Sequence, residues 1–92
     1  MILEVKFTNI FKDDLKLARK QNKNIDKLMT IINKIANCQQ LEEKYKDHAL
    51  LGKYSGTREC HIEPNWLLIY EVMEEDKVLV LYRTGSHSKL FR

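Results

Sequence analysis

Apolar and polar side chains alternate near the amino end and predict a β-strand over residues 2–7. Leu3, Val5 and Phe7 face one way, and the charged residues between them face the other. This two-residue period is typical of a strand with one buried face. The chain is therefore expected to begin with a half-buried strand.

The next two segments carry the three- to four-residue spacing of amphipathic helices. In the first, Phe11 and Ala18 mark the apolar stripe, and Thr8 or Asn9 can cap its start. Asn24 can cap the second helix after a polar break. The apolar stripe of this second helix consists of Ile25, Leu28, Ile32 and Ile35.

Three more strands are predicted in the second half, which contains all three glycines and the single proline. Residues 38–53 read as an irregular polar connection, and strands follow at 57–63, 66–72 and 77–84. The turns between these strands are short, so neighbouring strands should pair antiparallel. The order β-α-α-β-β-β predicts an α+β fold. In it, two N-terminal helices pack on one face of a four-stranded, mostly antiparallel sheet.

Composition narrows the class of protein without identifying it. The chain has 92 residues, which predicts a single domain over 1–92. Its net charge of +3 permits nucleic-acid binding, although on net charge alone a solvated charged surface is the better explanation. We find no signal-like or membrane-length apolar run and no paired-cysteine motif. These features predict a cytoplasmic protein with reduced thiols and no membrane partner.

Candidate chemistry lies in the second half, where His48, His61 and His87 all fall outside the two helices. The strand period places Glu59 and His61 on one face, and an adjacent strand brings Arg83 to the same sheet. Cleaving RNA without a metal requires a base for the ribose 2′-hydroxyl, an acid for the leaving oxygen and cations for the phosphate. Imidazole suits the first two tasks because its pKa is about 6.5, and guanidinium suits the third.

Other side chains in this half can hold a nucleic acid. Phe91 or Tyr54 can stack on an unpaired base. The cations expected to contact phosphates are Lys44, Lys46, Lys53, Lys89, Arg58, Arg83 and Arg92.

Two competing uses of these residues are weaker. A metal site usually needs ligands at short fixed spacing, whereas the histidines here are 13 and 26 residues apart. Cys60 could be a nucleophile, but it alternates onto the apolar face with Ile62, which favours a buried, inert thiol. Each histidine alone could also be structural. Residue spacing alone therefore predicts only a small α+β domain with a polar cleft. It predicts no metal and no cofactor.

Four ordered blocks carry a resemblance to a known family. They lie at residues 45–52, 58–66, 68–70 and 83–91. They resemble the patterns KDH-L-G, R-[DE]-x-H-[IV]-x-PD, L-I-Y and R-x-G-[ST]-H-x-x-LF of YafQ-type mRNA interferases, in the RelE/ParE toxin superfamily. The resemblance implies a type II toxin that cuts mRNA in the decoding site of a translating ribosome. It also implies 2′,3′-cyclic phosphate and 5′-hydroxyl products, no cofactor, and a small antitoxin as partner.

The resemblance also assigns roles to residues. It implies that His48, Glu59, His61, Arg83 and His87 are catalytic, with His87 the strongest candidate for the general acid. Glu59 stands where the family often has Asp, and Arg83 would face the transition-state phosphate. The residues expected to bind substrate are Phe91, Lys46, Lys53, Arg58, Asn65 and Lys89.

One position departs from the family pattern. Asn65 follows the proline where the family commonly has Asp, and an amide cannot act as a base. Glu63 is a possible stand-in. Two alternatives remain: a ParE-like toxin that binds DNA gyrase without cutting nucleic acid, and a basic interaction module that has lost toxicity. The histidine set argues against the gyrase binder, because a pure binder needs no titrating pair.

Overall fold

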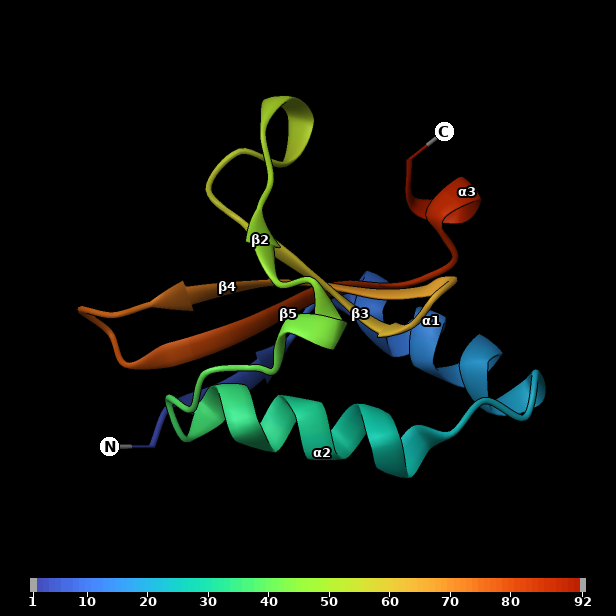
Figure 1. The fold of residues 1–92 in the computed structure, drawn as a ribbon, viewed down its shortest axis with the longest axis horizontal. Coiled ribbons are helices and arrows are strands. Elements are labelled where there is room, and N and C mark those ends of the chain that lie inside the picture. Colours follow the sequence, from blue (N-terminus) through green and yellow to red (C-terminus); the bar gives the residue numbers. More distant parts are fainter. Residues whose placement is uncertain (1, 92) are drawn as a thin grey trace.

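Two long helices lie on one face of a mixed sheet in the computed structural model, which describes residues 2–91 (Figure 1). Helix α1 spans Asn9–Lys20 and helix α2 spans Ile25–Ala36. No helix in the described part is long and apolar enough to cross a membrane. The strands are β1 (Glu4–Phe7), β2 (His48–Ala49), β3 (Arg58–Glu63), β4 (Trp66–Met73) and β5 (Val78–Gly85).

The predicted α+β class and the position of both helices on one face are confirmed, but the strand number was wrong. Within residues 2–91 the sheet has five strands in the order β1-β5-β4-β3-β2, and only β1 and β5 run parallel. The added strand β2 lies in the segment predicted to be irregular. His48 pairs with Glu59, and Ala49 pairs with Arg58. A two-residue strand is defined by a distant partner, so no local period could reveal it.

Short helical turns complete the second half. The residues that follow β5 form a four-residue helix, α3 (His87–Leu90), which Ser86 caps by accepting a hydrogen bond from the Lys89 N–H at 3.2 Å. The 3₁₀ turns η1 (Glu43–Tyr45) and η2 (Gly52–Tyr54) flank β2. All three are too short to show a helical period in sequence.

The predicted caps of both long helices are confirmed. Thr8 Oγ1 accepts from the Phe11 N–H at 3.0 Å, and Asn24 Oδ1 accepts from the Lys27 N–H at 3.1 Å. Thr8 also donates to the carbonyl of Tyr82 at 2.8 Å. This second bond ties the start of α1 to strand β5 and helps to set where the helix crosses the sheet.

The main core lies between the helices and the sheet, as the apolar stripes predicted. Cys60 and Ile62 point into it, which confirms the predicted inner face of β3. Phe7 is the exception: its side chain was expected to share the buried face with Leu3, yet it is 46% exposed. Its ring instead stacks on that of Phe11 at 5.6 Å, because β1 is the edge strand of the sheet.

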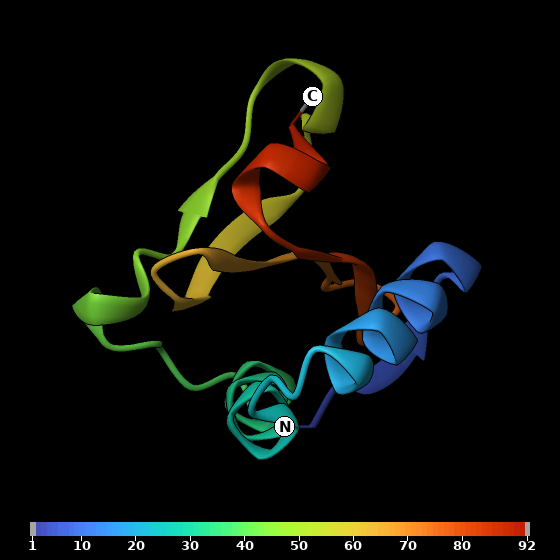
Figure 2. The same ribbon diagram turned by 90° about the vertical axis from the view of Figure 1, so that its right-hand side faces the viewer.

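A smaller apolar cluster covers the opposite sheet face. Leu67 and Ile69 of β4 are fully buried there beneath Leu90 of α3. Figure 2 shows α3 and the β2–η2 segment rising on this side, away from the two long helices. Strand β4 is therefore buried on both faces, which explains its continuous apolar sequence.

Candidate active site

A buried carboxylate, Glu59, joins two histidines on the sheet face opposite the long helices. Glu59 is 4% exposed. Its Oε1 lies 3.5 Å from Nε2 of His48 and 3.4 Å from Nε2 of His61. His48 is directly across from Glu59 in the β2–β3 pair, and His61 is two residues along β3, so all three side chains leave the same face. We call these three residues the histidine–carboxylate cluster.

The orientation of His48 is determined by its second ring nitrogen. Nδ1 of His48 lies 2.7 Å from the carbonyl oxygen of Lys46. A carbonyl can only accept, so Nδ1 carries the proton and Nε2 is the atom turned to Glu59. When Nε2 also binds a proton, the ring becomes a cation held against the carboxylate. The cluster can thus take up or release a proton at Nε2, which is what acid–base catalysis requires.

Helix α3 brings His87 to the same face of the sheet. Leu90 of this helix packs on Leu67. In the β3–β4 pair, Leu67 lies directly across from His61. The His87 N–H donates to Oδ1 of Asn65 at 3.4 Å. Asn65, the residue that departs from the family pattern, therefore contacts the start of the helix that carries the third histidine.

The ring of Phe91 contacts two other aromatic rings, one from α3 and one from η2. The rings of His87 and Phe91 are 4.9 Å apart, and those of Phe91 and Tyr54 are 5.5 Å apart, edge to face. The Tyr54 hydroxyl donates to the carbonyl of Leu90 at 3.2 Å. Tyr54 thus fastens the η2 turn to the tail and holds Phe91 beside His87.

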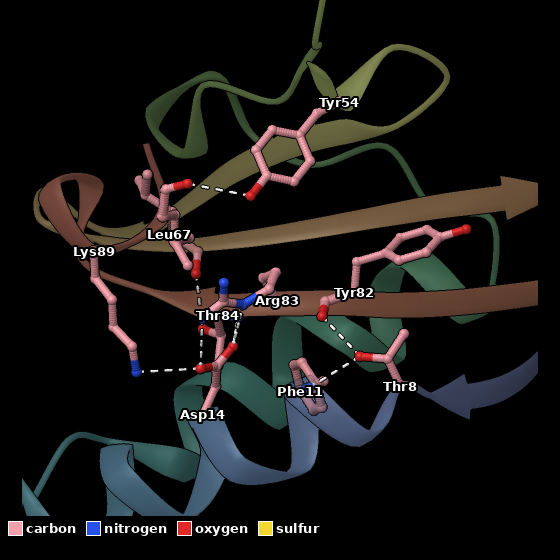
Figure 3. A network of polar contacts seen from close by, with 10 residues as sticks. Thr8, Phe11, Asp14, Tyr54, Leu67, Tyr82, Arg83, Thr84 and Lys89 are labelled. Atoms are coloured by element: carbon pink, nitrogen blue, oxygen red, sulfur yellow. Dashed lines mark hydrogen bonds and ion pairs between the residues drawn. The ribbon is translucent and has the colours of Figure 1, made fainter. Parts of the chain in front are cut away.

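Arg83 is held by a buried carboxylate that the sequence analysis did not single out. Its Nε and Nη2 donate to the two oxygens of Asp14 at 2.8 and 3.0 Å, leaving Nη1 outside this bidentate pair (Figure 3). Lys89 Nζ lies 3.1 Å from the same carboxylate, and the Thr84 N–H donates to it at 3.2 Å. Two of the cations predicted to contact phosphates, Arg83 and Lys89, thus converge on Asp14.

The contacts of Asp14 also change its ionisation. Asp14 is 4% exposed, and burial alone would raise its pKa. Hydrogen bonds from Arg83, the Thr84 N–H and Lys89 outweigh that effect, so the pKa of Asp14 lies below its ordinary value. The hydrogen bond to Asp14 in turn raises the pKa of Arg83. The sequence did indicate that Asp14 is buried, because it lies three residues after Phe11 and four before Ala18, on the apolar stripe of α1.

Arg58, predicted to bind substrate, is not brought to the cluster. It lies across from Tyr70, whose ring belongs to the core beneath the helices. Its Nε donates to Oδ1 of Asp47 at 3.2 Å, and the Tyr70 hydroxyl donates to the same oxygen at 2.6 Å. Burial acts to lower the pKa of Arg58, but Asp47 outweighs it and raises that pKa. Arg58 lies two residues before Cys60 on β3, so its side chain points to the same face of the sheet, the one that the long helices cover.

The remaining predicted residues lie at the margins of the site. Lys46 has a left-handed backbone (φ 49°) at the end of η1, and Lys53 lies over the Tyr54 ring at 5.7 Å. Glu63 forms an ion pair with Lys27 at 4.0 Å. Arg92 lies outside the described residues.

Cys60 is predicted to be chemically inert. Burial raises the pKa of its thiol to about 12, with smaller contributions from the nearby carboxylates. Cys38 is exposed. Titration of the native protein with a thiol reagent such as DTNB should therefore find one fast-reacting thiol, and the second only after unfolding. Two fast thiols in the native protein would contradict the burial of Cys60.

The chain is similar to the members of one toxin family and to solved toxin structures. Residues 3–92 match a family model described as a bacterial toxin of type II toxin–antitoxin system, YafQ. An mRNA interferase toxin YafQ of Escherichia coli K12 is 41% identical over 91 residues, covering 96% of this chain and 95% of that protein.

Two solved structures resemble the fold closely. The E. coli DinJ–YafQ toxin–antitoxin complex contains a chain with a TM-score of 0.89 and 35% identity, and the two chains cover each other completely. A metal-bound toxin from Helicobacter pylori has a TM-score of 0.93 and 38% identity, covering 98% of this chain and 100% of that one. In this chain, no group of three or more His, Cys, Asp or Glu among residues 2–91 could hold a metal.

Proposed function

This chain belongs to the YafQ family of toxins from bacterial type II toxin–antitoxin systems, and from this premise we propose how it acts on RNA. Like its E. coli relative it is an mRNA interferase, an endoribonuclease. We propose that it cuts mRNA in the decoding site of a translating ribosome, in the cytoplasm. The ribose 2′-oxygen attacks the adjacent phosphorus, and the bond from phosphorus to the 5′-oxygen breaks. The products are a 2′,3′-cyclic phosphate and a 5′-hydroxyl.

The observation that carries this proposal is the contact of one buried carboxylate with two imidazoles. Within that group, His61 or Glu59, aided by His48, takes the proton of the 2′-hydroxyl. His87 on α3 gives a proton to the leaving 5′-oxygen. Phe91, held beside His87, stacks on a base of the substrate.

The cations near α3 stabilise the negative charge of the phosphate. Asp14 holds Arg83 and Lys89 in one place, so both arrive at the site already oriented. Nη1 of Arg83 stays outside the pair with Asp14 and is the atom that would face the phosphate. Guanidinium and ammonium groups stabilise the charge that builds on phosphorus in the transition state.

The partner in the resting state is an antitoxin. The E. coli relative has been crystallised with the protein DinJ as a toxin–antitoxin complex. We propose that this chain likewise binds a small antitoxin, which covers its basic surface and keeps substrate out. The net charge of +3 makes an acidic partner segment the better fit.

Inducing the chain without its antitoxin tests the proposal. Primer extension or ribosome profiling should find new 5′ ends within translated codons, and purified programmed ribosomes should yield the same cuts. Uncut mRNA together with stalled replication would instead support binding to DNA gyrase. Normal growth would support a module without toxicity.

Removal of transition metals should leave cleavage unchanged, because the proposed proton transfers use imidazole and carboxylate groups alone. The measurement is the cleavage rate on programmed ribosomes with and without a chelator selective for transition metals. The Mg²⁺ concentration is kept constant so that the ribosomes stay assembled. Cleavage that stops with the chelator and returns with added metal would overturn the metal-free mechanism.

A further inference from the structure

A recess of about 300 Å³ opens beside His61, at the margin of the histidine–carboxylate cluster. Three segments far apart in the sequence meet there: helix α2, the turn η1 and the end of β3. None of the proposed roles above uses this recess as a site. We call it the lysine recess. The residues that matter in it are Lys27, Lys44, Tyr45, Lys46, His61 and Glu63.

The charge of the lysine recess favours an anion. Three lysines and one glutamate, Glu63, line it, although Lys44 Nζ also lies 3.9 Å from Oε2 of Glu42, which does not line the recess. The pair between Lys27 and Glu63 is long, at 4.0 Å, and both side chains are more than a third exposed. Such an exposed pair contributes little and can exchange partners. Lys27 can therefore turn to a bound phosphate without losing a strong interaction.

The recess and the cluster share parts of the same chain. His61 lines the recess with its ring while Nε2 contacts Glu59. Lys46 lines it too, and the carbonyl of that same residue orients His48. Lys46 has a left-handed backbone (φ 49°), a conformation that costs free energy in a residue other than glycine. A ligand in the recess thus lies next to His61.

The walls suit a nucleotide better than a bare ion. Tyr45 is half-buried and packs against the main core, so its ring is held in place. Pro64 adds to this apolar wall. The volume is at the small end of ligand sites, which begin at about 300 Å³. A ribose and base can pack on these walls while the lysines contact the phosphate.

We propose that the lysine recess binds the nucleotide of the RNA that adjoins the cleaved phosphate, with Lys27 as a phosphate-binding residue. This inference rests on the proposed endoribonuclease function. It names a binding residue on α2 that neither the motifs nor the cluster contains. An acidic segment of a partner protein would be the competing occupant.

The chain offers a matched pair of variants for the test. Lys27→Gln removes one charge from the recess. Lys34→Gln removes one charge from the same helix outside it. The two side chains are 37% and 36% exposed, and each pairs with one glutamate, Glu63 or Glu42. Both variants should fold alike, which circular dichroism and a thermal melt check.

Cleavage of mRNA on programmed ribosomes should separate the two variants. In Lys27→Gln, KM should rise about three- to tenfold with kcat unchanged, as expected for the loss of one hydrogen bond of ordinary strength at an exposed site. The slope of log(kcat/KM) against log[salt] should become shallower by about 0.7. Lys27→Arg should restore KM, and Lys34→Gln should match the wild type.

Other outcomes overturn the inference. If Lys27→Gln equals Lys34→Gln in KM and in salt slope, the recess does not bind the substrate. A fall confined to kcat would exclude a binding role for Lys27. Unchanged cleavage with weaker antitoxin binding would assign the recess to the partner protein. If the wild type itself cuts no mRNA, the proposed function is wrong. This result differs from the others, in which the wild type cuts mRNA and only the role of the recess is rejected.

Discussion

Replacing His87 with alanine should slow cleavage of mRNA by about 10²–10⁴-fold, the usual contribution of one positioned acid or base. His87 is the proposed donor of the proton to the leaving 5′-oxygen. Its side chain is exposed, and its one hydrogen bond to Asn65 uses the backbone N–H, which alanine keeps. The variant should therefore stay folded, within about 0.5 kcal/mol of the wild type, as is usual for surface substitutions.

The measurement is single-turnover cleavage on programmed ribosomes, with ribosomes and toxin in excess over mRNA so that the chemical step is followed. Ser88→Ala is the matched control, because Ser88 is exposed on the same short helix and has no proposed role. Its rate should equal that of the wild type. Undiminished cleavage by His87→Ala would remove His87 from the mechanism and leave the acid to His48 or His61.

Asp14→Ala should lower the free energy of unfolding by about 3 kcal/mol, the lower end of what breaking a buried ion pair costs. The lower end applies because the orphaned side chains of Arg83 and Lys89 are 23% and 32% exposed and can regain water. In a chain of this size the melting temperature should fall by about 12–24 °C. Asp13→Ala is the control, since Asp13 is the exposed neighbour on the same helix. A melting temperature equal to that of the control would show that the Asp14 network contributes nothing to folding.

The same carboxylate predicts how stability depends on pH. The pKa of Asp14 is depressed in the folded protein, so its unfolded pKa of about 3.9 is the higher of the two. Its contribution is then complete above the unfolded pKa and is lost as pH falls through the folded pKa. The stability difference between the wild type and Asp14→Asn should be largest near neutral pH and should shrink below about pH 4. Urea unfolding across this range measures it, and a difference that is constant with pH would contradict the assignment.

The Asp14 network also connects folding with the site. One carboxylate on α1 holds Arg83 of β5 and Lys89 of α3, so it joins the helix layer to the segment that carries His87. The tail is held a second time by the hydroxyl of Tyr54. A four-residue helix has little stability of its own, and these two attachments hold its residues in position together with the packing of Leu90 on Leu67.

Local patterns in the sequence predicted the elements whose causes are local. The side chains of Thr8 and Asn24 cap the two helices as expected, because a cap needs only a partner three residues away. The two-residue period of β3 correctly separated Glu59 and His61 from Cys60, since parity along one strand needs no distant partner.

Tertiary structure decided the contacts between distant residues. His48 meets Glu59 only because β2 pairs with β3, and Arg83 meets Asp14 across 69 positions of the chain. Arg58 was expected at the substrate, but alternation along β3 places it on the same face as Cys60, and there only the packing of distant segments pairs it with Asp47. A period along one segment encodes which face is apolar. Only the packing of segments against one another determines which charged groups meet, and hence where the site is assembled.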